Sequence, residues 1–132
     1  MDSDKIEIMI NNRYGEFGFS KKAIKEYNLR KSKLNQNLNN ELFSNLIART
    51  DKIMIQIYKD FNGDINSFFS QIKICQIDKK YQNCYTIDSF GGIEKIVVDY
   101  KQYKLNQITQ ILESNMNESE KLDEINKIIK SP

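Results

Sequence analysis

The chain contains no histidine and no tryptophan among its 132 residues, and proline occurs once. Without histidine there is no Ser-His-Asp or Cys-His arrangement, no imidazole ligand for a metal and no histidine proton shuttle. Mechanisms that use carboxylates alone stay open. The composition therefore favours a binding or structural role over catalysis.

Glycine and cysteine are also scarce. The sequence has no glycine-rich phosphate-binding loop that ends in Gly-Lys-Ser or Gly-Lys-Thr. The pair Gly15 and Gly18 also lacks the third glycine of the dinucleotide-binding motif. Cys75 and Cys84 have neither metal-ligand nor redox-dipeptide spacing, so we expect small buried thiols. If the segment between them is a hairpin that turns at Lys79-Lys80, a disulfide becomes geometrically possible. We expect no cofactor and no metal.

Long apolar runs are missing, and neither sign of charge dominates. No segment approaches the ~18 apolar residues of a membrane span, and residues 1–5 are polar and acidic, unlike a signal peptide. The 20 basic and 18 acidic residues are spread along the chain. We therefore expect an intracellular protein that binds neither membranes nor nucleic acid.

The hydrophobic pattern predicts an α+β domain in which a small, mostly antiparallel sheet packs against helices. Residues 5–10 alternate as a strand does, and Ser20 is placed to cap a helix over 21–29. Residues 30–40 are polar and indicate an insertion, while 41–48 and 52–61 have helical spacing, the latter after Thr50-Asp51 as a cap. Segments 71–77, 85–88 and 93–99 predict an antiparallel meander.

The carboxy-terminal residues predict two amphipathic helices. Asn117 with Glu120 resembles a capping box at the start of the second helix. The apolar sides of these two helices form a stripe that another surface must cover. The default expectation is that the domain's own sheet covers it, and the alternative is a second copy or another protein. We expect a core domain over 1–103 with a helical extension over 104–132. The candidate oligomer-interface residues are Leu105, Ile108, Leu112, Leu122, Ile125 and Ile129.

The segment Arg13–Ser20 joins the first strand to the first helix and contains three aromatics and two glycines. One interpretation is that the aromatics close one end of the core. The other is a binding site, in which backbone N–H groups at the helix start hold a phosphate or carboxylate, with Asp88 and Glu94 as carboxylates. A match to the aromatic strand of RNA-recognition domains is excluded, because this segment leads into a helix. The site candidates are Arg13, Tyr14, Phe17, Phe19, Ser20, Lys21, Lys22, Asp88 and Glu94.

The stretch Ile8–Ala23, IMINNRYGEFGFSKKA, resembles the opening of an uncharacterised family of small proteins from bacteriophages and giant (nucleocytoplasmic large) DNA viruses. Those proteins begin with a strand, a Tyr-Gly-Gly-Phe-Gly-like loop and a helix. Glu16 stands where the family usually has its second glycine. Later blocks are similar in the same order: Arg49–Asp51, Ile72–Ile74 with Ile77–Asp78, Tyr85–Asp88 and Gly92–Glu94.

The resemblance spans roughly Ile6 to Asp99 and implies a viral origin, without an activity, cofactor or catalytic residue. We expect a non-enzymatic viral accessory or structural protein, in the host cytoplasm or the virion, that binds a protein partner or self-associates. The alternative is a small-ligand or nucleotide-type anion-binding protein or enzyme that uses the Arg13–Ser20 loop.

Overall fold

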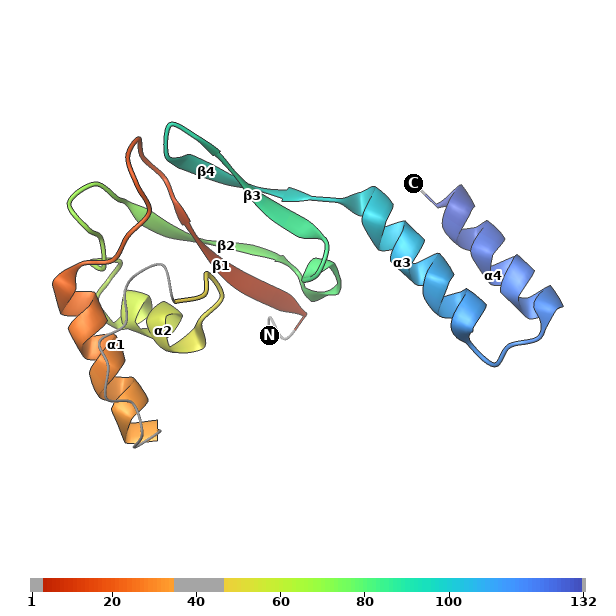
Figure 1. Cartoon of the computed structure of the whole chain (residues 1–132), viewed down its shortest axis with the longest axis horizontal. Coiled ribbons are helices and arrows are strands. Elements are labelled where there is room, and N and C mark those ends of the chain that lie inside the picture. The colour runs from red at the N-terminus through yellow and green to blue at the C-terminus, as the bar shows by residue number, and fades with distance from the viewer. Residues whose placement is uncertain (1–3, 35–46, 132) are drawn as a thin grey trace.

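The computed structural model describes residues 4–34 and 47–131 and shows an α+β fold, which confirms the predicted class (Figure 1). Helices α1 and α2 lie against one side of the β1–β2 pair, and the β3–β4 hairpin lies beside that pair. In chain order the elements are β1 (Lys5–Asn11), α1 (Lys21–Leu34), α2 (Lys52–Asp60), β2 (Ile72–Asp78), β3 (Tyr85–Phe90), β4 (Ile93–Val98), α3 (Tyr100–Glu113) and α4 (Glu118–Lys130).

The strands form two antiparallel pairs rather than the predicted meander. β1 pairs with β2, with Lys5 opposite Asp78 and Asn11 opposite Ile72. β3 pairs with β4 through a turn at Gly91-Gly92, where φ is 61° and 98°. Positive φ at both central residues matches the right-handed twist of a tight hairpin, and glycine adopts it without strain.

The meander prediction fails at the connection between β2 and β3. Residues 79–81 form a short 3₁₀ helix, η2 (Lys79–Tyr81), instead of a two-residue turn. Two lysines do not favour the positive φ that such a turn requires. Cys75 therefore lies opposite Ile8 of β1, and Cys75 and Cys84 are free thiols, the second of them buried.

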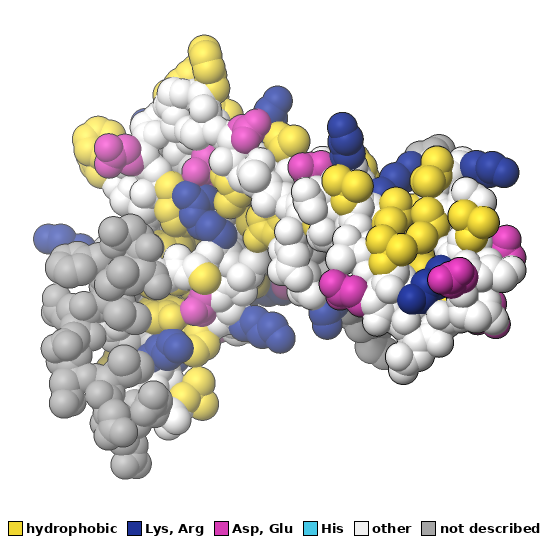
Figure 2. Space-filling view, turned by 45° about the vertical axis from the view of Figure 1, so that its right-hand side comes forward, with side chains coloured by type: hydrophobic (Ala, Val, Ile, Leu, Met, Phe, Trp, Pro, Cys, Tyr) yellow, Lys and Arg dark blue, Asp and Glu magenta, His cyan; other side chains and the backbone are white. Residues whose placement is uncertain are grey.

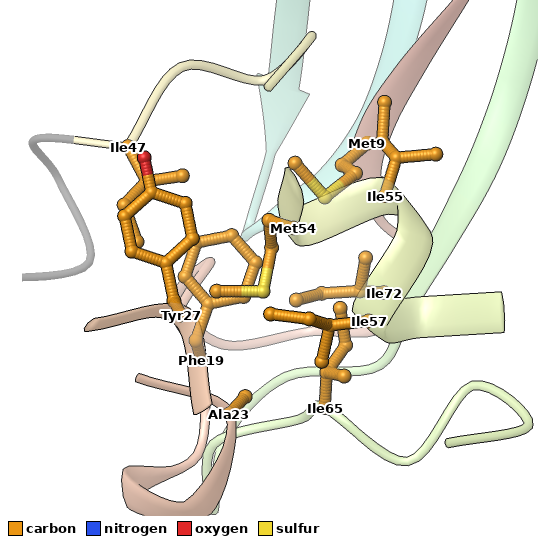
Figure 3. Close-up of a cluster of buried hydrophobic side chains, with 10 residues drawn as sticks. All are labelled: Met9, Phe19, Ala23, Tyr27, Ile47, Met54, Ile55, Ile57, Ile65 and Ile72. Carbon is orange, nitrogen blue, oxygen red and sulfur yellow. The ribbon is translucent and has the colours of Figure 1, made fainter. Parts of the chain in front are cut away.

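The core lies between β1, β2 and the first two helices (Figure 3). Ser20 Oγ accepts the N–H of Ala23 at 3.1 Å, and Asp51 Oδ1 accepts the N–H groups of Ile53 and Met54 at 2.9 and 3.1 Å. These contacts confirm both predicted helix caps. The buried cluster comprises Met9, Phe19, Ala23, Tyr27, Ile47, Met54, Ile55, Ile57, Ile65 and Ile72.

Helix α1 continues into the segment predicted as a polar insertion. Arg30 pairs with Glu26 one turn earlier and with Asp60 at the end of α2, each at 2.9 Å, and these contacts favour the longer helix. The rest of the proposed insertion, and residues 41–46 of the helix expected over 41–48, lie outside the described residues. Ile47 and Ala48 themselves are not helical.

Helices α3 and α4 form an antiparallel pair that lies to one side of the molecule, away from α1 and α2 (Figure 1). Asn117 Oδ1 accepts the N–H of Glu120 at 2.8 Å and its amide donates to the Glu120 carboxylate at 3.0 Å, which confirms the predicted capping pair. The ring of Tyr81 contacts those of Tyr100 and Tyr103 and joins α3 to the body. Among the described residues, no helix combines the length and apolar character needed to cross a membrane.

Candidate functional site

The Arg13–Ser20 loop divides into a buried part and an exposed part. Phe19 is 6% exposed and belongs to the core, and Phe17 packs against it edge to face with ring centres 5.1 Å apart. Tyr14 is 65% exposed. The core-cap interpretation therefore describes Phe17 and Phe19, whereas Tyr14 is available at the surface.

Glycines allow this loop to lie directly against the β3–β4 turn and the chain before β2. The Gly15 N–H donates to the Gly91 carbonyl at 2.9 Å. A Cβ on Gly92 would lie 1.5 Å from the Gly15 oxygen, and one on Gly15 would lie 2.4 Å from the Phe69 oxygen, so both positions require glycine. Glu16 has no positive φ. A glutamate in place of the second glycine of the motif that this loop resembles therefore needs no left-handed backbone.

Four exposed aromatic residues stand on these three segments, and we call them the loop tip. Tyr14 contacts the β3–β4 turn, Phe68 and Phe69 stack edge to face at 4.9 Å, and Phe90 directly precedes the turn. Exposed fractions are 65% for Tyr14, 85% for Phe68, 60% for Phe69 and 79% for Phe90. Sequence reasoning selected only Tyr14. The signal for Phe90 was its place beside Gly91-Gly92, since hairpin turns are exposed.

Glu94, a predicted site residue of β4, pairs with Arg49 in the chain before α2 and accepts a hydrogen bond from β1. Its carboxylate receives both arms of the Arg49 guanidinium at 2.7 and 2.9 Å and the N–H of Asn11 at 2.7 Å. The side chain of Glu94 is 9% exposed, and the Arg49 guanidinium lies 3.4 Å from the centre of the Phe17 ring. These contacts make Glu94 a structural residue, and Arg49 was missed because it lies 45 residues away in sequence.

Asn11 is fully buried at the end of β1 and completes the same junction. Its amide donates to the carbonyls of Arg13 and Gly92 at 3.0 and 2.9 Å, and its oxygen accepts the Gln71 N–H at 2.9 Å. Because buried polar groups require partners, these bonds fix the Arg13–Ser20 loop, the β3–β4 turn and the start of β2 relative to one another. A single asparagine in a strand gave no sequence signal for this role.

The residues proposed for anion binding are not brought together as one site. Arg13 and Lys21 are exposed and form no ion pair within the described part of the chain. Lys22 lies over the Phe61 ring at 4.8 Å. Asp88 is opposite Lys95, whereas Glu94 is opposite Ser89. Neighbouring pairs in a hairpin point to opposite faces, so the two carboxylates cannot share a ligand in the way the alternative reading requires.

An uncovered apolar face runs along α3 and α4. Leu105, Leu112, Leu122 and Ile129, which we call the hairpin face, are 49%, 57%, 61% and 61% exposed. Ile108 and Ile125, the other two interface candidates, are half-buried. Neither helix contains a buried residue, so the default expectation that the domain's own sheet covers the stripe is wrong. Figure 2 shows hydrophobic side chains gathered over this pair of helices.

A buried tyrosine of the core has a shifted pKa. Burial, strengthened by a 2.7 Å hydrogen bond to Asp51, raises the pKa of Tyr27. Within residues 4–34 and 47–131, no three potential metal ligands converge.

No protein-family model, no curated protein and no solved structure matches the chain.

Proposed function

We propose that this chain is a non-enzymatic viral accessory or structural protein that acts by binding protein, and that its hairpin face pairs with a second copy of itself. The observation that carries the proposal is the exposure of Leu105, Leu112, Leu122 and Ile129 on two capped helices. Residues seven apart lie on the same side of a helix, so the two on each helix form one stripe. A stripe of this kind is stabilised when another apolar surface covers it.

The charges of α4 favour a second copy as the occupant. The first half of α4 contains four acidic residues and one lysine, Glu118, Glu120, Lys121, Asp123 and Glu124, whereas the last turn contains Lys127 and Lys130. Two copies related by a twofold axis place the acidic half of one α4 beside the basic half of the other. Such an arrangement is self-complementary and closes after two subunits.

The expected affinity is modest. A fully buried leucine or isoleucine contributes roughly 1.5–3 kcal/mol, so covering four half-exposed side chains on each of two copies contributes roughly 6–12 kcal/mol. Association costs about 4 kcal/mol or more in lost freedom of motion. We therefore expect a free energy of dimerisation no stronger than about −8 kcal/mol. This corresponds to a Kd in the micromolar range or higher.

Light scattering after size-exclusion chromatography tests the proposal. The wild-type chain should show a mass that rises from 15.6 kDa towards twice that value as concentration increases. The variant Leu105→Ser/Leu122→Ser should stay at the monomer mass with unchanged helix content. Leu29→Ser on α1 is a matched control, because Leu29 is exposed to the same 49% as Leu105. A wild type that stays monomeric up to millimolar concentration contradicts the proposal.

The loop tip is a second candidate surface, for a foreign protein partner. Four aromatic side chains that are at least 60% exposed on three fixed segments support it. A pull-down with Tyr14→Ser/Phe90→Ser as the comparison tests this surface, and partners that bind both forms equally remove it. Phe17 is unsuitable for that test, because its ring lies against the Arg49 guanidinium that pairs with Glu94.

The viral origin rests on the resemblance of Ile8–Ala23, and a place in the host cytoplasm or the virion follows from that origin. Mass spectrometry of purified virions and of infected-cell fractions tests both. If the protein is found neither in virions nor in infected cells, the result contradicts both proposals.

A further inference from the structure

A hollow of about 760 Å³ lies between β1, the start of α2 and the chain that leaves β2. Its volume falls within the roughly 300–1,000 Å³ of small-molecule sites. Ile6 of β1 and Ile55 of α2 give it an apolar part, and the ring of Tyr85 also lines it. None of these residues belongs to the hairpin face or to the loop tip.

Four lysines from three separate segments line this hollow: Lys5, Lys52, Lys59 and Lys79. Among the described residues, Glu7 is the only acidic one in the lining, so the lining has more positive charge than the net +2 of the whole chain. The composition concealed this concentration, since these lysines are spread along the sequence and meet only in the fold. A hollow lined by one sign of charge concentrates ligands of the opposite sign.

The ion pairs around the hollow leave part of that charge available. Lys59 pairs with Glu7 at 2.9 Å, and Lys5 pairs with Asp78, which lies outside the lining. Lys52 and Lys79 form no ion pair with any residue that the structure describes. Both side chains are exposed, so they can turn towards a ligand at little cost.

Neutral polar groups complete the lining and narrow the class of ligand. Gln82 and Asn83 supply amides that both donate and accept hydrogen bonds, and Gln56, whose amide donates to Asp60 at 2.9 Å, also lines the hollow. The backbone N–H groups of Ile53 and Met54 at the start of α2 are already bonded to Asp51, so side chains rather than the helix end must hold an anion. Lysines beside amides and an apolar part suit phosphate groups joined to a small organic body.

We propose that this hollow binds a phosphorylated small molecule of nucleotide size, with Lys52 and Lys79 as the main phosphate ligands. The phosphates lie between these two lysines, while the organic part contacts Ile6, Ile55 and Tyr85. The site is separate from the anion site considered at the Arg13–Ser20 loop. It is also independent of self-association through the hairpin face.

Isothermal titration calorimetry of the full chain, in magnesium-free buffer of low ionic strength, tests the site with three probes: ATP, tripolyphosphate and adenosine. ATP should bind, and Lys52→Gln/Lys79→Gln should weaken it roughly tenfold or more, because two charges near the phosphates are removed. The matched control Lys25→Gln/Lys33→Gln removes two exposed lysines of α1 outside the hollow and should change affinity by less than about twofold.

The probes separate the parts of the ligand. ATP that binds more tightly than tripolyphosphate supports the nucleotide-sized ligand, and equal affinity of the two overturns the role of the apolar part. Three results overturn the phosphate site. These are no binding of ATP, an equal loss of ATP affinity in both double variants, and adenosine that binds as tightly as ATP. Far-UV circular dichroism of each variant confirms that the fold is kept.

Discussion

The Arg49–Glu94 pair makes the sharpest prediction for stability. The change is Glu94→Ala, which removes a carboxylate whose side chain is only 9% exposed. Three hydrogen bonds disappear with it: two from the Arg49 guanidinium and one from the Asn11 N–H. Within the described part of the chain, the Asn11 N–H then has no acceptor, and Arg49 keeps only its 3.3 Å hydrogen bond to the Met9 carbonyl.

The magnitude follows from burial. Removing one partner of a fully buried ion pair costs about 3–5 kcal/mol. Arg49 keeps 28% exposure of its side chain, so water compensates part of this loss. The unpaired Asn11 N–H adds about 1 kcal/mol. We expect Glu94→Ala to lower the free energy of unfolding by about 3 kcal/mol and the melting temperature by about 10 °C.

Two further variants sharpen this test. Glu94→Gln keeps an oxygen for the Asn11 N–H and should cost about 1–2 kcal/mol, less than the alanine variant. Lys59→Ala removes the exposed pair with Glu7, where the lysine side chain is 49% exposed, and should cost less than about 1 kcal/mol. Urea unfolding followed by circular dichroism measures all three. A Glu94→Ala cost no larger than that of Lys59→Ala would refute the reasoning.

Three other predictions concern pH, backbone approach and pairing. The raised pKa of Tyr27 means that the folded state keeps the phenol proton above pH 10.0, where the unfolded chain loses it. The contribution of Tyr27 to the free energy of unfolding is therefore fully present below pH 10.0 and falls as the pH rises above that value. Tyr27→Phe should be less stable than wild type at about pH 8 but lose less on going to about pH 11, in urea unfolding, and an equal loss contradicts the assignment. Gly92→Ala should destabilise the chain by about 2 kcal/mol or more in thermal unfolding, because its Cβ would meet backbone 1.5 Å away, and an unchanged melting temperature rejects the close approach. Lys127→Glu/Lys130→Glu should weaken self-association at low salt in sedimentation velocity, whereas unchanged or tighter association rejects the twofold arrangement of α4.

Local sequence signals predicted local structure well. Ser20, Asp51 and Asn117 each cap the helix expected after them, because a cap depends on a side chain and the N–H two or three residues later. The alternating strand pattern at 5–10 and the helical spacing beyond 104 were correct for the same reason.

Pairing over long sequence separation was not predictable. The meander expected for β2, β3 and β4 assumed that neighbouring strands pair, yet β2 pairs with β1 across 60 residues or more. The bond between Arg49 and Glu94 and the meeting of four lysines in one hollow have the same character. Each depends on which surfaces meet in the fold, and no local pattern records that.

The exposure of the tail stripe could not be decided from its pattern either. A helix with a polar and an apolar side looks the same whether its apolar side covers a sheet or faces solvent. Only the position of α3 and α4 beside the body, joined to it through Tyr81, distinguishes the two cases.

Amide hydrogen exchange of the full chain at a low and a high protein concentration tests the central claim most directly. If two copies pair through the hairpin face, exchange in α3 and α4 slows as concentration rises, while the rates in β1 and β2 stay constant. Exchange in α3 and α4 that is the same at both concentrations, up to the millimolar range, would contradict self-association through this face.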